Sequence, residues 1–328
     1  MYYLKYGLKD LGWGRLGWWL GGVYAVGILL GALGIGNLFQ ANQAYEQLNS
    51  VWGEAVSPVW VGAILALLVL SVILGGIQSI SSVTEKIVPF MAALYCGSAL
   101  IIIALNAAYL PSALLAILTG AFTGAGVKGG ALGVMVIGFQ RAVFSNEAGI
   151  GSASIAHSAV KTDEPVTEGV VALLEPFIDT IVICTITALV ITTSQLADPQ
   201  FAQGAEGVAM TSAAFARHIS WFPYLLAVAA VLFALSTMIS WSYYGLKGWS
   251  YLFGEGALGH AIYKAMFCLF VFLGPVISLG PILDISDALV FLICLPNIFG
   301  LYLLAPKVKA EMERYFARVR SGEIKRYR

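Results

Sequence analysis

The chain has 328 residues and no formal net charge, with 59% apolar and only 11% charged residues. Ordinary soluble domains carry about 25% charged residues, so this composition excludes a soluble globular protein. No strongly basic, aromatic-rich patch indicates binding of nucleic acid. The sequence predicts an all-α fold, a polytopic membrane helix bundle that forms one domain over residues 1–306, followed by a basic cytoplasmic tail at 307–328.

Long stretches with few or no charged residues predict about eight membrane-crossing segments, because about 20 apolar residues span the hydrocarbon core. Hydropathy places these segments at residues 17–40, 58–77, 86–107, 130–160, 168–193, 221–246, 262–280 and 285–305. An even number puts both termini on one side of the membrane. Of the 18 Lys and Arg residues, only Lys128, Arg141 and Arg217 lie away from that side. The positive-inside rule therefore predicts a multi-pass protein with both termini in the cytoplasm.

The first segment contains the stretch GALGIGNLFQAN, which combines glycines with two amides. Gly27 and Gly31 form a small-xxx-small face that lets another helix approach closely. Asn37 and Gln40 lie one turn apart near the predicted outer end of this segment. The amides allow two readings, a polar site between helices or a cap at the membrane interface.

The fourth segment, residues 130–160, is too long for one straight crossing. At about 1.5 Å per residue it would extend over about 46 Å, against about 30 Å of hydrocarbon. Gly149 and Gly151 weaken the helix, and Ser145 and Asn146 are residue types that begin a new one. We therefore expect this helix to break near residues 145–149.

A helix broken at membrane depth is typical of a transport site, because half-helix ends and unwound carbonyls hold substrates and cations there. Glu147 is expected in the first turn of the second arm, where an acid complements the helix dipole. In the competing reading, Ser145 and Asn146 cap a helix at the membrane surface and Glu147 is an ordinary first-turn acid. Taken by itself, this segment supports both readings equally.

Two acids, Glu175 and Asp179, lie one turn apart in the apolar stretch LLEPFIDT. Acids inside a membrane-crossing segment are functional candidates by default. Pro176 between them indicates a kink or a late helix start. A late start would place Glu175 near the cytoplasmic surface and weaken its candidacy.

Ser236 and Thr237 are adjacent hydroxyls in an apolar helix, one turn before Trp241. Two hydroxyls can complete an oxygen cage for a small hard cation such as sodium. Alternatively, each hydroxyl bonds back to the preceding turn of its own helix, and this local reading is favoured when the pair is considered alone. As a second polar group in the membrane, the pair favours the transport-site reading of the break near 145–149.

Other motifs indicate no chemistry. GAGVKG, at residues 124–129, fits a nucleotide-binding pattern, but no strand precedes it. His157, His218 and His260 have no carboxylate at ligand spacing, and the four cysteines are far apart. We therefore expect no catalytic residue, no metal site beyond sodium and no cofactor.

Five stretches carry a family resemblance: FSNEAGIGSASIAH, LLEPFIDTIVICTITALVI, SWSYYG, GIGNLFQAN and VTEKIVPFMAALY. They resemble the alanine or glycine:cation symporter family, which are sodium-coupled carriers with a leucine-transporter-like fold. The resemblance implies an inverted repeat of five and five helices in the plasma membrane of a prokaryote. It also implies symport of a small neutral amino acid, alanine or glycine, with sodium as the coupling ion and membrane lipids as surroundings.

The resemblance also implies roles for individual residues. The substrate pocket would comprise Phe144, Ser145, Asn146, Ile150, Thr237 and Trp241. In this pocket Trp241 would limit the volume left for the substrate side chain. Ser236 and Thr237 would be sodium ligands, and weaker candidates near the site are Asn37, Gln40, Glu147 and Asp179.

The chain departs from the family pattern at its beginning, where MYYLKYGL resembles a stretch that follows earlier helices in the family. The resemblance then implies that the first two core helices, including the first broken helix, are absent here and belong to an upstream-encoded portion. Two hypotheses follow. Either the sequence is part of a working symporter, or the chain as written is a non-transporting remnant or a membrane interaction subunit.

Overall fold

The computed structural model describes residues 1–123, 130–201, 204, 207–218 and 220–324, and these residues form helices and turns without a strand. The first half contains α1 (Tyr2–Asp10), α2 (Gly14–Leu33), the π-helix η1 (Gly34–Leu38), α3 (Phe39–Trp52), η2 (Gly53–Ala55), α4 (Pro58–Ile73), α5 (Gly76–Leu105), η3 (Ala107–Tyr109), α6 (Leu110–Thr123), α7 (Gly130–Asn146) and α8 (Ser152–His157). The second half contains α9 (Pro165–Ala172), α10 (Leu174–Pro176), the π-helix η4 (Phe177–Cys184), α11 (Thr185–Ala197), α12 (Val208–His218), α13 (Phe222–Phe253), α14 (Ala257–Leu273), η5 (Gly274–Val276) and α15 (Leu279–Ser321). The predicted motif GAGVKG lies outside the described residues.

Six helical units among the described residues are long and apolar enough to cross a membrane. They are Gly14–Trp52, Gly76–Leu105, Pro165–Ala197, Phe222–Phe253, Ala257–Val276 and Leu279–Ser321. Pro58–Ile73 and Ala107–Phe122 are shorter apolar helices. This architecture confirms the all-α, polytopic membrane helix bundle.

Several predicted segment boundaries were wrong. The segment predicted at 58–77 is the shorter helix α4, which ends at Ile73. The first segment does not end near residue 40, because α2, η1 and α3 continue one another to Trp52. Between the long helices α11 and α13 lies the short helix α12.

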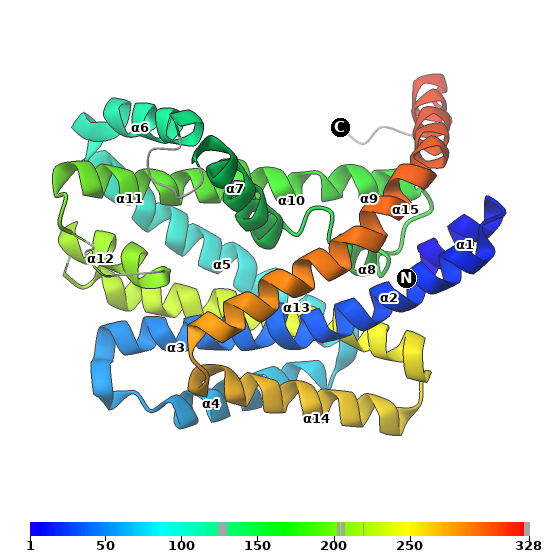
Figure 1. Ribbon diagram of the computed structural model, residues 1–328, viewed down its shortest axis with the longest axis horizontal. Coiled ribbons are helices and arrows are strands. Elements are labelled where there is room, and N and C mark those ends of the chain that lie inside the picture. The colour runs from blue at the N-terminus through cyan, green and yellow to red at the C-terminus, as the bar shows by residue number, and fades with distance from the viewer. Residues whose placement is uncertain (124–129, 202–203, 205–206, 219, 325–328) are drawn as a thin grey trace.

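The helices form layers on both sides of the unit made by α2 and α3, which run end to end across the molecule (Figure 1). Along one edge α4 packs against α14, and along the opposite edge α6 packs against α11. Helix α13 contacts α2, α3, α5 and α14, so it is the central helix of the bundle. The N-terminus and the last turns of α15 lie on the right-hand side in Figure 1.

Small residues allow α2 to pack closely on two other helices, as such residues do between membrane helices. A Cβ added at Gly248 of α13 would lie 2.8 Å from Ile28 Cγ2. A Cβ at Gly27 or Gly31 would lie 3.1 Å or 2.7 Å from side-chain atoms of Ile293 on α15. The expected close-packing role of Gly27 and Gly31 is therefore confirmed.

Candidate functional site

The helix that begins at Gly130 is broken, as its length predicted. Helix α7 ends at Asn146 and α8 begins at Ser152, and three residues between them have left-handed backbone: Glu147 at φ 56°, Gly149 at φ 84° and Gly151 at φ 91°. Glu147 is the one non-glycine residue with positive φ in the described ranges. Such a conformation costs free energy for a residue with a side chain, so the surroundings of Glu147 must hold it in place.

The roles expected for Ser145, Asn146 and Glu147 at the start of the second arm were wrong. Ser145 and Asn146 are the last residues of the first arm, and α8 follows Gly151 without a side-chain cap. Glu147 lies in the unwound stretch rather than in the first turn of α8. Since α8 has only six residues, we assign it no dipole site for a carboxylate.

The end of the first arm is attached to the π-helix η4. Ser145 Oγ donates to Asp179 Oδ2 at 2.7 Å, and Asn146 Nδ2 donates to Thr180 Oγ1 at 2.8 Å. Asn146 Oδ1 also accepts from the backbone N–H of Ala148 at 2.8 Å, which closes a turn at the start of the break. The structure thus joins Ser145, Asn146 and Asp179, three residues that the sequence predicted for the site.

Glu147 joins the break to the central helix α13. Its Oε1 accepts from the indole Nε1–H of Trp241 at 2.7 Å, and its Oε2 accepts from the hydroxyl of Ser152. The indole of Trp241 can only donate, whereas the hydroxyl of Ser152 can donate or accept. Trp241, predicted for the pocket wall, therefore lies directly beside the break.

Asn297 of α15 holds the other end of the break, and sequence reasoning missed this residue. Its Nδ2 donates to Gly149 O at 2.8 Å, and its Oδ1 accepts from the hydroxyl of Tyr3. A Cβ at Gly151 would lie 2.5 Å from Asn297 Oδ1, so only glycine fits there. The signal available in the sequence was the polar amide of Asn297 within residues 288–306, a stretch that contains no charged residue.

Trp241 also packs against the π-helix η1. The Trp241 side chain is 1% exposed, and a Cβ at Gly36 would lie only 2.1 Å from its Cγ. Asn37 in the same turn donates from Nδ2 to Phe267 O at 2.8 Å, while its buried Oδ1 has no partner among the described residues. Gln40 Nε2 donates to Ile35 O at 3.4 Å. Because helix continues on both sides of them, Asn37 and Gln40 do not cap a helix at the membrane interface, which excludes that reading.

Two further pocket candidates pack at the same place. Phe144 makes an edge-to-face contact with Phe39, with ring centroids 5.0 Å apart. Ile150 is fully buried in the hydrophobic cluster that also contains Trp241 and Ile35. The break, η1 and α13 therefore share one packed interface.

The hydroxyls of Ser236 and Thr237 are bonded within their own helix. They donate to Phe233 O at 2.9 Å and 3.0 Å, as the local alternative predicted. Ser236 Oγ also lies 3.7 Å from Met91 Sδ of α5. A hydroxyl that donates keeps its lone pairs, so a role as cation ligand stays a prediction.

Two cavities are lined by residues of the site or its neighbours. A cavity of about 1070 Å³ is lined in part by Asn146, Glu147, Gly149, Glu175 and Asn297. A second cavity of about 260 Å³ is lined by Gln40, Phe233 and Ala234 together with residues of α5, α11 and α12. Trp241 belongs to neither lining, whereas its partner Glu147 lines the first cavity.

The fold brings two carboxylates that are distant in the sequence beside His157. His157 Nδ1 lies 2.5 Å from Glu168 Oε1, and Nε2 lies 3.8 Å from Glu175 Oε2. Sequence spacing missed these contacts because the chain turns between α8 and α9. At the other end of the bundle, His218 pairs with Asn106 at 2.7 Å, and burial followed by the charge of Arg217 lowers the pKa of His218.

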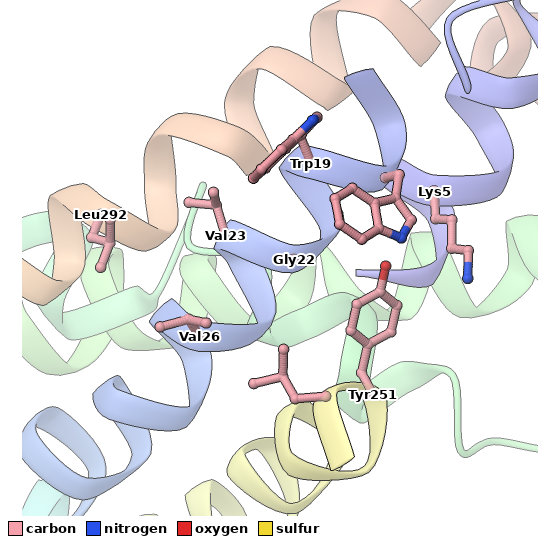
Figure 2. A pocket seen from close by; sticks show the side chains of 9 residues that line it. Lys5, Trp19, Gly22, Val23, Val26, Tyr251 and Leu292 are labelled. Atoms are coloured by element: carbon pink, nitrogen blue, oxygen red, sulfur yellow. The ribbon is translucent and has the colours of Figure 1, made fainter. Parts of the chain in front are cut away.

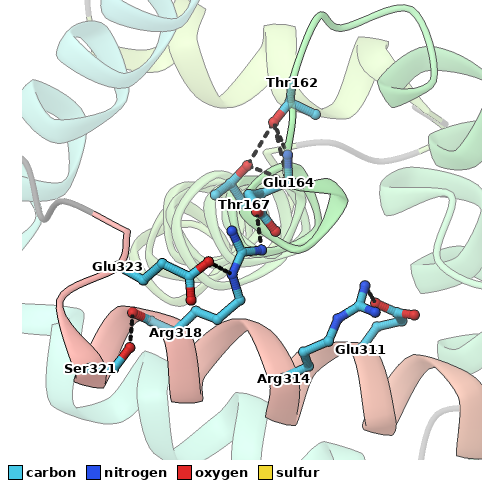
Figure 3. A network of polar contacts seen from close by, with 8 residues as sticks. All are labelled: Thr162, Glu164, Thr167, Glu311, Arg314, Arg318, Ser321 and Glu323. Atoms are coloured by element: carbon cyan, nitrogen blue, oxygen red, sulfur yellow. Dashed lines mark hydrogen bonds and ion pairs between the residues drawn. The ribbon is translucent and has the colours of Figure 1, made fainter.

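The loop between α8 and α9 is tied to the end of α15. Arg318 Nη1 donates to Glu164 Oε1 at 2.5 Å, and Arg318 Nε donates to Glu323 Oε1 at 2.8 Å. Thr162 and Thr167 bond to each other and to the backbone around Glu164, as Figure 3 shows. Helix α15 therefore contacts the broken segment both at Asn297 and beyond α8.

Comparison with known proteins gives consistent results. The sequence model described as "Sodium:alanine symporter family" matches residues 1–328. The sodium/alanine symporter AgcS of Methanococcus maripaludis is 39% identical over 326 residues, which are 99% of this chain and 70% of that protein. The amino-acid carrier protein AlsT of Bacillus subtilis is 32% identical over 289 residues, 88% of this chain and 60% of that protein. The probable sodium/glutamine symporter GlnT of Bacillus subtilis is 31% identical over 324 residues, 98% of this chain and 65% of that protein.

Proposed function

Because the chain belongs to the sodium:alanine symporter family, we propose that it carries alanine or glycine together with sodium by alternating access around the break between α7 and α8. Family membership establishes sodium-coupled amino-acid symport by a multi-pass membrane protein, which is not an enzyme. The choice of alanine or glycine, the pocket and the membrane orientation are our proposals.

The observation that carries the proposal is the unwound stretch 147–151 and its attachments. Asn146, directly before the stretch, bonds to η4; Glu147, its first residue, bonds to α13; and Gly149, its middle residue, bonds to Asn297 of α15. Unwound backbone at membrane depth is tolerated where it lines a cavity, and in transporters it lies at the substrate site. Here the large cavity reaches Asn146 through Gly149.

We assign the substrate to the packed interface beside this break. The pocket would comprise Phe144, Ser145, Asn146, Ile150, Thr237 and Trp241, as the sequence predicted. The buried ring of Trp241 occupies space that a larger amino-acid side chain would need, which favours alanine or glycine. The free carbonyl oxygen of Asn37 adds an acceptor for a substrate ammonium group or a cation.

Sodium would be held by Ser236 and Thr237, with Phe233 O as a further oxygen. Both hydroxyls lie about 3 Å from this carbonyl. Hard cations prefer such oxygen ligands. Because the described residues around this pair include no carboxylate contact, sodium is favoured over a proton as the coupling ion.

The orientation follows from the distribution of positive charge. Of the 18 Lys and Arg residues, all but Lys128, Arg141 and Arg217 fall on the side predicted for the termini, so we propose that both termini face the cytoplasm and that the protein lies in the plasma membrane of a prokaryote. Alanine entering the cell would then leave the site toward the cavity lined by Glu147 and Glu175.

The test is uptake of radiolabelled alanine by vesicles containing the full-length protein. We expect accumulation with a sodium gradient and background uptake when choline replaces sodium. Asn146→Ala and Trp241→Ala should each lower the initial rate by about tenfold or more, because one hydrogen-bonded contact in a closed site is worth that much. Gly97→Ala is the control, since no atom lies within 4 Å of the added Cβ. Equal uptake in choline would refute sodium coupling.

A further inference from the structure

A groove on the outside of the bundle lies apart from the broken helix. It has a volume of about 480 Å³ and lies between α1, α2 and parts of α13 and α15 (Figure 2). Its lining consists of Lys5, Trp18, Trp19, Gly22, Val23, Val26, Tyr251, Leu252 and Leu292. None of these residues takes part in the proposed transport site.

The groove is polar at one end and apolar at the other. Lys5 is its only charged lining residue, and Figure 2 shows Lys5 and Tyr251 at one end, with Val26 and Leu292 at the other. Along α2 the lining extends from Trp18 to Val26, which is about 12 Å of helix at about 1.5 Å per residue. An occupant with a charged head and an apolar chain would match this gradient.

The groove lies along a candidate membrane span and has exposed side chains. Trp19 and Val26 are 66% and 43% exposed, although both lie in the candidate membrane span Gly14–Trp52. Trp18 and Trp19 make an edge-to-face pair at the start of α2, with centroids 5.0 Å apart. Tryptophan at a helix end is typical of the interface between hydrocarbon and lipid headgroups. With this helix across a membrane, an occupant of the groove would lie at the level of the lipids.

The charge of Lys5 is held over this interface. Its Nζ lies 5.4 Å from the ring centroid of Tyr6 and 5.7 Å from that of Tyr251. The ring of Tyr251 is positioned by close packing on α2, since a Cβ at Gly21 would lie 2.8 Å from its hydroxyl oxygen. An ammonium group on aromatic faces keeps donors for an anion, and no acid in the lining competes for it.

We propose that this groove binds one anionic phospholipid, with its phosphate at Lys5 and an acyl chain over Gly22, Val23 and Val26. Charge complementarity argues for an anionic lipid, because lysine near the headgroup layer attracts anionic lipid specifically. The apolar half argues for an acyl chain rather than a soluble phosphate. Gly22 leaves the floor open, since a Cβ there would meet no atom within 4 Å.

The experiment measures quenching of tryptophan fluorescence by brominated lipid. The full-length protein is placed in phosphatidylethanolamine vesicles that contain a minor fraction of brominated phosphatidylglycerol or, in parallel, brominated phosphatidylethanolamine. The quenching that arises in the groove is the quenching of the unaltered protein minus that of a Trp18→Phe/Trp19→Phe variant. We expect this quenching to show about fivefold preference for the anionic lipid, the size typical of one lysine at an anionic surface.

Two variants separate the headgroup from the chain. Lys5→Gln should abolish the preference for phosphatidylglycerol. Gly22→Leu should fill the floor and lower quenching by both lipids, whereas Gly97→Leu, which also enters open space on α5, should leave quenching unchanged. Equal quenching by the two lipids in the unaltered protein would overturn the proposal. Absence of quenching by either lipid would also overturn it, because another chain segment or a second copy would then cover the groove.

Discussion

The indole N–H of Trp241 is buried and has Glu147 Oε1 as its acceptor at 2.7 Å. A buried donor that loses its acceptor costs about 1–3 kcal/mol, whereas replacing both partners with apolar groups can be nearly neutral. The same contact holds Glu147 in its left-handed conformation. The pair therefore acts as one unit within the site.

We predict that Glu147→Ala and Trp241→Phe are strongly non-additive. Glu147→Ala should destabilise the protein by about 1–3 kcal/mol, but by less in the Trp241→Phe background, where no indole N–H is left unpaired. Unfolding followed by near-ultraviolet circular dichroism in detergent would give the cycle. Ser71→Ala serves as control because Ser71 is exposed and bonds only to Leu68 O of its own helix. Simple addition of the two effects would show that the contact does not couple these residues.

At Gly36 the packing leaves no room for a Cβ atom. A Cβ there would lie 2.1 Å from Cγ of Trp241, and both residues are buried in close-packed surroundings. Overpacking of this kind costs about 1–3 kcal/mol. We predict that Gly36→Ala lowers the thermal midpoint by several degrees. In a protein of this size, each kcal/mol of destabilisation lowers the midpoint by about 2–4 °C or less. Gly97→Ala should leave the thermal midpoint unchanged, because the added Cβ meets no atom within 4 Å. Equal midpoints for the two variants would contradict this account.

At the scale of elements, α15 contacts both the broken segment and the loop that follows α8. Asn297 bonds to Gly149 in the break, and Arg318 bonds to Glu164 in the loop after α8. Figure 3 shows Arg318 between Glu164 and Glu323. A half-exposed ion pair of this kind contributes little to global stability but restricts the loop that it joins.

We predict that Arg318→Gln speeds amide hydrogen exchange in residues 158–165 and leaves the thermal midpoint nearly unchanged. Lys309→Gln is the matched control, because Lys309 pairs with Glu313 within the same helix and contacts no loop. In the Lys309→Gln variant, amide hydrogen exchange in residues 158–165 should remain as in the unaltered protein. If Arg318→Gln also left exchange at 158–165 unaltered, the ion pair would have no role in holding the loop.

At the scale of the whole molecule, sodium-coupled symport requires that sodium and amino acid bind with mutual dependence. A ligand that binds only the folded state raises the unfolding midpoint, and coupling between two ligands is reciprocal. We predict that alanine raises the thermal midpoint in sodium buffer but not in choline buffer. Thr237→Val keeps the side-chain shape, removes the hydroxyl and should abolish the effect of sodium. A full alanine shift in choline would show that the two ligands bind independently.

The local chemistry of the candidate site could be predicted in part. The length of the 130–160 stretch and its glycines indicated a break, because a straight helix of that length exceeds the hydrocarbon core. The position of Glu147 within the break could not be predicted, since its left-handed backbone depends on Trp241 and Ser152, which reach it from other turns. The same limit hid the contact of Asn297 with Gly149, which depends on where α15 crosses the break.

By itself, the sequence determined that this protein is an all-helical membrane bundle, because burial in lipid demands long uncharged helices whose backbone groups are satisfied internally. It also determined the family, since the polar and glycine residues around the break form a specific pattern. Only the tertiary structure decided that η1 continues α2 into α3, which moved Asn37 from a helix end to the buried interior. It also decided which side chains meet at the break, because helices far apart in the chain are brought together by packing that no local pattern encodes.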